Sequence, residues 1–62
     1  MKEFQTTIGN INYRSVNSPM IKKILVYMCE PQGKICIEEH NKEIETQNEL
    51  ESFAIENEKN YA

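Results

Sequence analysis

The chain has 62 residues and a net charge of −3 at pH 7, from ten glutamates, no aspartate, and seven lysines and arginines. A single core of this size rarely supplies more than about 3–5 kcal/mol, so the length excludes a two-lobed enzyme with a deep active site and makes oligomerisation useful. The acidic balance argues against general nucleic-acid binding through a basic surface.

Neither a targeting segment nor a membrane span is expected. Residues 1–7 lack the apolar core of a secretory signal, and the longest apolar run, residues 24–29, is far shorter than the roughly 20 residues that cross a bilayer. Without a secretory signal the two cysteines are expected to stay reduced, which predicts a cytoplasmic protein.

Residues 3–16 are expected to form a β-hairpin. Apolar and polar residues alternate on both sides of Gly9-Asn10, a pair that suits a two-residue turn matching the twist of the strands. With that turn, Ile8 faces Ile11. The apolar side chains of the hairpin then share one face, made of Phe4, Ile8, Ile11 and Tyr13.

Residues 21–39 are expected to form a second hairpin around Pro31-Gln32-Gly33. Pro31 presets the φ angle of a turn, and Gly33 can adopt the left-handed conformation that a bulge requires. We expect this bulged turn, which places Glu30 opposite Lys34. A tight two-residue turn would instead shift the pairing by one residue and exchange the neighbours.

Residues 19–29 carry the main ambiguity, because Ser18 could cap a helix that begins at Pro19, and apolar residues recur there at helical spacing. The β-branched residues and the short turn that follows favour a strand. The expected fold is therefore one small α+β domain: a four-stranded antiparallel sheet from two β-hairpins with a C-terminal α-helix (ββββα). The alternative is ββαβα, with residues 19–29 helical.

Residues 46–59 are expected to form the helix. Thr46 and Glu49 fit a capping box, in which the Thr46 hydroxyl accepts from the amide of Glu49 and the Glu49 side chain reaches back. The stripe that packs on the sheet is narrow and consists of Leu50, Phe53 and Ala54, with Tyr61 as a candidate fourth member. The end of the helix is expected to fray into a polar tail that includes Asn57, Lys59 and Asn60.

The strand over residues 24–29 is apolar on both faces, so it calls for cover on both sides. One helix covers only one face of a sheet, so the second face is a candidate contact with another copy of the chain or with a different protein. The alternative is that Ile24 or Met28 lies under the N-terminal hairpin or a loop. We expect a homodimer whose self-association surface consists of Ile24, Val26 and Met28.

No residues point to catalysis, a cofactor or a metal. Cys36, Glu38 and His40 alternate along one strand and are metal-binding types, but no second cluster completes a tetrahedral site. The two glycines have turn roles, so no glycine-rich loop is available to cradle phosphate. We therefore expect no enzyme activity, no cofactor and no metal.

Charge is distributed unevenly along the chain. Residues 1–34 carry a net charge of +3, from five basic and two acidic groups, and residues 35–62 carry −6, from two basic and eight acidic groups. The molecule is expected to be electrostatically two-sided, with an acidic surface for a basic protein partner. The residues expected to form this partner-binding surface are Glu38, Glu39, Glu43, Glu49, Glu51, Glu56 and Glu58.

These features predict a small non-enzymatic protein-binding inhibitor or regulator. A tiny acidic chain suits an inhibitor of a nucleic-acid enzyme of host defence, such as the anti-CRISPR proteins that phages and mobile elements encode, although no single residue carries this step. The alternative is a small homodimeric single-stranded nucleic-acid-binding protein. Its phosphate contacts would come from Lys2, Arg14, Lys22 and Lys23.

Overall fold

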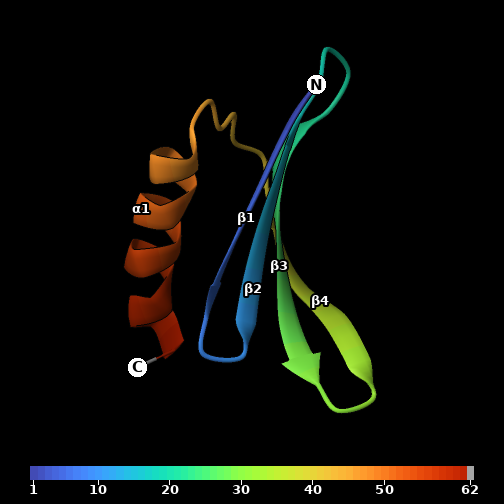
Figure 1. Ribbon diagram of the computed structural model, residues 1–62, viewed down its shortest axis with the longest axis vertical. Helices are drawn as coiled ribbons and strands as arrows, with labels where there is room; N and C mark the ends of the chain where they lie inside the picture. Colours follow the sequence, from blue (N-terminus) through green and yellow to red (C-terminus); the bar gives the residue numbers. More distant parts are fainter. Residues whose placement is uncertain (62) are drawn as a thin grey trace.

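The computed structural model describes residues 1–61, which form one antiparallel sheet, one α-helix and a short 3-10 helix. The strand order is β1-β2-β3-β4, so each strand pairs with the next one in the sequence (Figure 1). The elements are β1 (Lys2–Ile8), β2 (Ile11–Asn17), β3 (Lys22–Glu30), β4 (Gly33–His40), α1 (Gln47–Glu58) and the short 3-10 helix η1 (Lys59–Tyr61). The predicted ββββα fold is confirmed, and the ββαβα alternative is wrong because its helical segment is strand β3.

The turn between β1 and β2 has the predicted register, with Ile8 opposite Ile11. Gly9 has a φ of +60°, whereas Asn10 keeps a negative φ, and this combination is that of a type II′ turn. The turn matches the twist of the two strands, and it keeps the apolar side chains of the hairpin on one face.

Ser18 closes the turn between β2 and β3 and does not cap a helix. Its amide donates to the Ile21 carbonyl at 2.8 Å, and its hydroxyl accepts from the Ile21 amide at 3.1 Å. These local bonds return the chain into β3, where the β-branched residues of the segment pair with β2.

The hairpin of β3 and β4 closes through a two-residue turn, Pro31-Gln32, with Glu30 opposite Gly33. The predicted pairing of Glu30 with Lys34 is therefore wrong by one residue. Gly33 still has a positive φ, +142°, which only glycine adopts readily, and it leads the chain directly into β4.

The bulge lies further along β4, at Ile37, which has no partner on β3. Since side chains alternate along a strand, one extra residue reverses the faces that the following residues use. As a result His40, rather than Glu39, lies opposite Ile24. The bulge thus places Glu38 and His40, instead of Ile37 and Glu39, on the helix side of the sheet.

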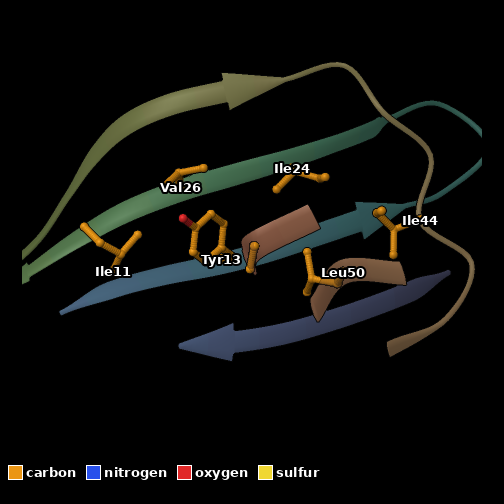
Figure 2. Close-up of a cluster of buried hydrophobic side chains, with 7 residues drawn as sticks. Ile11, Tyr13, Ile24, Val26, Ile44 and Leu50 are labelled. Carbon is orange, nitrogen blue, oxygen red and sulfur yellow. The ribbon is translucent and has the colours of Figure 1, made fainter. Parts of the chain in front are cut away.

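Helix α1 lies over β1 and β2 on one face of the sheet (Figure 1). The buried core under the helix takes side chains from β2, β3, α1 and the segment before α1, and none from β4 (Figure 2). Its members are Ile11, Tyr13, Ile24, Val26, Ile44, Leu50 and Ala54. Burying these side chains is the main source of stability in a sheet that has only one covered face.

The self-association surface predicted on β3 is wrong in its placement. Ile24 and Val26 are fully buried, and Met28 packs against the core. The register of β2 and β3 explains this, because Tyr13 lies opposite Val26 and joins the two apolar faces into one surface. The opposite, uncovered face carries the half-buried side chains of Lys23, Leu25, Tyr27 and Cys29 of β3.

The segment before α1 is fixed at two points. Thr46 caps the helix as predicted, because its hydroxyl accepts from the Glu49 amide at 3.2 Å. The Glu49 carboxylate bonds the Thr46 hydroxyl at 3.4 Å and not its amide, so only the first bond of the capping box forms. Ile44 is fully buried, and its carbonyl accepts from the Asn17 side chain at 3.1 Å.

Candidate functional site beside the C-terminal helix

Most charged side chains pair with one another on the surface. Three ion pairs join a lysine of residues 1–34 to a glutamate of residues 35–62: Lys2–Glu45, Lys22–Glu43 and Lys23–Glu39. One further pair lies within each half, Arg14–Glu3 in the first and Lys59–Glu56 in the second. The predicted two-sided charge distribution is therefore wrong, because the opposite charges of the two halves meet on the same surfaces.

The ion pairs weaken the hypothesis of a nucleic-acid-binding surface and leave an excess of unpaired acidic groups for the hypothesis of a basic protein partner. All four cations expected to contact phosphates already contact a carboxylate. A phosphate would have to displace that carboxylate, although exposed pairs are individually weak. The charged side chains of residues 1–61 outside the five pairs are mostly acidic: Glu30, Glu38, Glu49, Glu51 and Glu58, against Lys34 and Lys42.

One of these pairs ties the first strand to the segment before α1. Hydrogen bonds with the Glu43 carboxyl, the Lys2 ammonium and the Asn17 amide lower the pKa of Glu45 to about 2. The same contact with Glu45 raises the pKa of Lys2. The ammonium and the Glu45 carboxylate lie 2.7 Å apart, and both groups stay charged throughout the neutral range.

Two residues of the predicted acidic surface point toward the interior. Glu58 accepts a hydrogen bond from the Tyr13 hydroxyl, and Glu38 lies 2.7 Å from the His40 ring nitrogen Nε2. The Asn57 amide joins these groups, at 3.3 Å from the Tyr13 oxygen and 3.5 Å from Glu38. Glu38 and Glu58 therefore help to hold α1 on the sheet.

Burial and the hydrogen bond to Glu58 raise the pKa of Tyr13 to about 12. The hydroxyl therefore stays protonated and donates to the carboxylate throughout the neutral range. This polar cluster satisfies its own groups inside the molecule and leaves little of them for a ligand.

Two other predicted residues lie apart from α1. Glu39 pairs with Lys23 on the uncovered face of the sheet, since it sits opposite the half-buried Leu25. Glu43 pairs with Lys22 at 3.4 Å in the segment before the helix. Of the seven predicted glutamates, the structure keeps three exposed on α1: Glu49, Glu51 and Glu56.

Glu49 and Glu56 line one open pocket of about 470 Å³ beside α1. They are two helical turns apart, so both side chains extend from the same side of the helix. The other lining residues are Lys42, Asn48, Ser52 and Phe53. Glu51 lies nearer β1, where it accepts from Gln47 at 3.1 Å, and it does not line this pocket.

Phe53 supplies the aromatic surface of the pocket. Its half-buried ring meets His40 edge to face, with centroids 5.1 Å apart, and meets Tyr13 at 6.2 Å. These contacts hold the ring in place between the helix and the sheet. An aromatic surface flanked by two carboxylates suits the apolar stem and charged head of an arginine or lysine side chain.

Within residues 1–61, no group of three metal-ligating side chains comes together. No helix in that range combines the length and apolar character needed to cross a bilayer. Comparisons with protein-family models, with curated proteins and with solved structures found no match.

Sequence reasoning missed Asn57, which was expected to fray but is buried with 7% exposure. The available signal was its spacing, because Asn57 follows Leu50 by seven residues and Ala54 by three and so continues the buried stripe. Lys42 was also missed as a lining residue, and nothing local in the sequence places this loop residue beside α1.

Proposed function

We propose that the protein is a small non-enzymatic module that binds a basic protein through the pocket beside α1. The observation that supports this most is that Glu49 and Glu56 flank Phe53 in one pocket. Four of the five cations of residues 1–34 are already paired, so the charge left for a partner is mainly negative.

The two parts of an arginine side chain of the partner fit two parts of this site. Its methylene stem lies against Phe53, and its guanidinium bonds the carboxylates of Glu49 and Glu56. The existing Glu56–Lys59 pair, at 3.0 Å, has side chains that are 75% and 71% exposed, so it is weak and easily exchanged. The net charge of the chain speeds the encounter, and the aromatic contact lengthens the lifetime of the complex.

Nucleic-acid enzymes present grooves lined with arginine and lysine, and they are the class of partner that this surface suits. A chain bound in such a groove would compete with nucleic acid and act as an inhibitor or regulator. This role is the one expected from the size and charge of the sequence.

A matched pair of double variants tests the site. Glu49→Gln/Glu56→Gln removes two charges from the pocket, and Glu30→Gln/Glu51→Gln removes two charges elsewhere without breaking an ion pair. A fluorescent deca-arginine peptide serves as the probe in an anisotropy titration. We expect the pocket variant to bind at least tenfold more weakly, and the control to bind within about twofold of wild type. Equal losses in both variants would mean non-specific attraction and would overturn the proposal.

The nucleic-acid alternative is tested separately with a labelled single-stranded oligonucleotide of random sequence. Since its four candidate cations are paired, we expect no binding at physiological salt. Saturable binding that weakens steeply with salt, and that Lys22→Ala/Lys23→Ala removes, would favour the nucleic-acid function instead.

A further inference from the structure

The two edges of the sheet differ in how they are covered. At the edge formed by β1, α1 packs against the strand and the Gln47 side chain donates to the outward Gln5 carbonyl at 2.8 Å. At the edge formed by β4, α1 contacts only the C-terminal part of the strand, where Phe53 meets His40 and the Asn57 amide bonds Glu38, and no fully buried core side chain comes from β4. The helix itself lies over β1 and β2, at the other edge of the sheet (Figure 1). Within residues 1–61, β4 is therefore the edge left free to pair with another strand.

The free backbone groups of β4 can be assigned from its neighbours. The Cys29 amide donates to the Asn10 carbonyl at 2.8 Å, so the polar groups of Cys29 point toward β2. Its partner Lys34 therefore directs its own N–H and C=O away from β3, and so does Cys36, two residues later. The bulge at Ile37 breaks this alternation. The segment open to pairing is Gly33–Ile37, with its free groups at residues 34 and 36.

A row of apolar side chains ends at the middle of this segment. Ile8, Ile11, Met28 and Ile35 lie directly opposite one another across β1, β2, β3 and β4. Ile11 is 4% exposed, whereas Ile35, at the open edge, is 51% exposed. The row is thus incomplete on one side, at the residue midway between the two free backbone positions.

We propose that two copies of the chain pair through Gly33–Ile37 as antiparallel edge strands, with the two-fold axis at Ile35. In this register Lys34 lies opposite Cys36 of the partner subunit, so the free N–H and C=O groups at both positions satisfy one another. Ile35 lies opposite Ile35 of the partner subunit in a close, non-hydrogen-bonded pair, and the apolar row continues across the interface. The result is a continuous eight-stranded sheet.

The charge distribution favours this contact over other contacts between copies. Each α1, with its unpaired glutamates, lies over β1 and β2, at the side of the sheet away from the axis. Pairing through β4 therefore keeps the acidic helices far apart, whereas a contact across the helix would bring like charges together. This inference is independent of the basic partner, because none of the residues 33–37 lines the pocket beside α1.

Sedimentation over a concentration series gives the first test. We expect a monomer–dimer equilibrium for the wild type, and a shift of the midpoint to at least tenfold higher concentration in Ile35→Lys, which opposes two ammonium groups at the axis. Ile55→Lys is the matched control, because Ile55 is also exposed, at 62%, but lies on α1. Circular dichroism confirms that each variant is folded. A wild type that stays monomeric, or an Ile35→Lys variant that dimerises normally, would overturn the proposal.

Disulfide trapping tests the register in a background of Cys29→Ser and Cys36→Ser. After mild oxidation we expect a covalent dimer from Ile35→Cys, because cysteines opposite each other in a non-hydrogen-bonded pair are well placed to bond. Ile55→Cys should remain largely monomeric. Equal cross-linking at both positions would show random collision and would contradict the interface.

Discussion

At the scale of single residues, Ser15 is the side chain whose environment fits it least. It is fully buried, its hydroxyl has no hydrogen-bond partner within residues 1–61, and its neighbours across the sheet are Phe4 and Ile24. An unsatisfied buried hydroxyl costs about 1–3 kcal/mol. We expect Ser15→Ala to raise the free energy of unfolding by about 1 kcal/mol, measured by urea denaturation.

A second serine provides the control for this prediction. The Ser18 hydroxyl is bonded to the Ile21 amide in the turn, so Ser18→Ala removes a bond that is made. The expected changes therefore have opposite signs in the two variants. A loss of stability in both would mean that the Ser15 hydroxyl has a partner, such as a bound water.

Tyr13 makes stability depend on alkaline pH. Its pKa is about 12 in the folded chain and near 10 when unfolded, so its contribution is complete below pH 10. Between pH 10 and 12 the unfolded state loses the proton first, and stability falls by roughly 2–3 kcal/mol at about 1.4 kcal/mol per pH unit. Tyr13→Phe should be less stable than the wild type at pH 7 by about 1–2 kcal/mol. Because the wild type loses more than this between pH 10 and 12, the difference should shrink and then change sign within this range.

Chemical denaturation at several pH values measures this effect. Tyr27→Phe is the matched control, because Tyr27 lies half-buried on the uncovered face, away from Glu58. It should change stability by less than about 0.5 kcal/mol at any pH. If Tyr13→Phe kept a constant difference from wild type up to pH 12, the hydrogen bond to Glu58 would not be the cause.

At the scale of the elements, the start of α1 depends on one side chain. Thr46 satisfies an amide that has no partner within the helix, and the helix is only 12 residues long. We expect Thr46→Ala to cost about 1 kcal/mol, while Ser52→Ala, at an exposed position in the helix, should be neutral or slightly stabilising. Thermal melts of both variants measure the difference.

The same scale shows what local patterns can and cannot predict. Alternation and turn residues predicted both hairpins, and the capping residue Thr46 predicted where α1 begins. The two-residue turn also predicted the register of the first hairpin. The register of β3 with β4 and the choice of the buried face of β3 depend on longer-range packing, and here sequence reasoning failed. The pairing of Tyr13 with Val26 decides that the apolar face of β3 lies inside, and neither residue carries a local signal of it. The bulge at Ile37 likewise could not be predicted, because neither Ile37 nor its neighbours Cys36 and Glu38 are turn-forming residues.

The candidate site was only partly predictable for the same reason. The spacing of seven residues alone puts Glu49 and Glu56 on one face of a helix, so the sequence predicts that the two carboxylates lie near each other. Their pocket also needs Phe53, held by His40 through the β4 bulge, and Lys42, which a long-range loop brings close. Sequence reasoning cannot show that the carboxylates of Glu38 and Glu58 form intramolecular hydrogen bonds with His40 and Tyr13 and are therefore less available to a partner.

At the scale of the whole molecule, stability depends on how completely one small core is closed. Ile44 belongs to a segment without regular structure, yet it is fully buried and completes the core at the end of α1 (Figure 2). Ile44→Ala should cost about 2–4 kcal/mol, which approaches the total stability of a domain of this size. We expect a large unfolded fraction at room temperature.

The milder variant Ile44→Val should cost about 0.5–1.5 kcal/mol and remain folded, so that urea denaturation gives a value. The exposed Ile55 is the reference, and Ile55→Ala should change stability by less than about 0.5 kcal/mol. Similar costs at both isoleucines would mean that the core does not depend on the segment before α1.

The ion pairs between the two halves of the chain also favour association of the halves as separate fragments. Cut at the exposed tip of the second hairpin, residues 1–31 carry four basic and two acidic groups, a charge of +2, and residues 32–62 carry three basic and eight acidic groups, a charge of −5. Two such pieces attract in solution, and their edges already match in register. The fold is thus suited to division into two fragments that reassemble. Lys2, Lys22 and Lys23 of the first fragment would recognise the second fragment through their ion pairs with its glutamates.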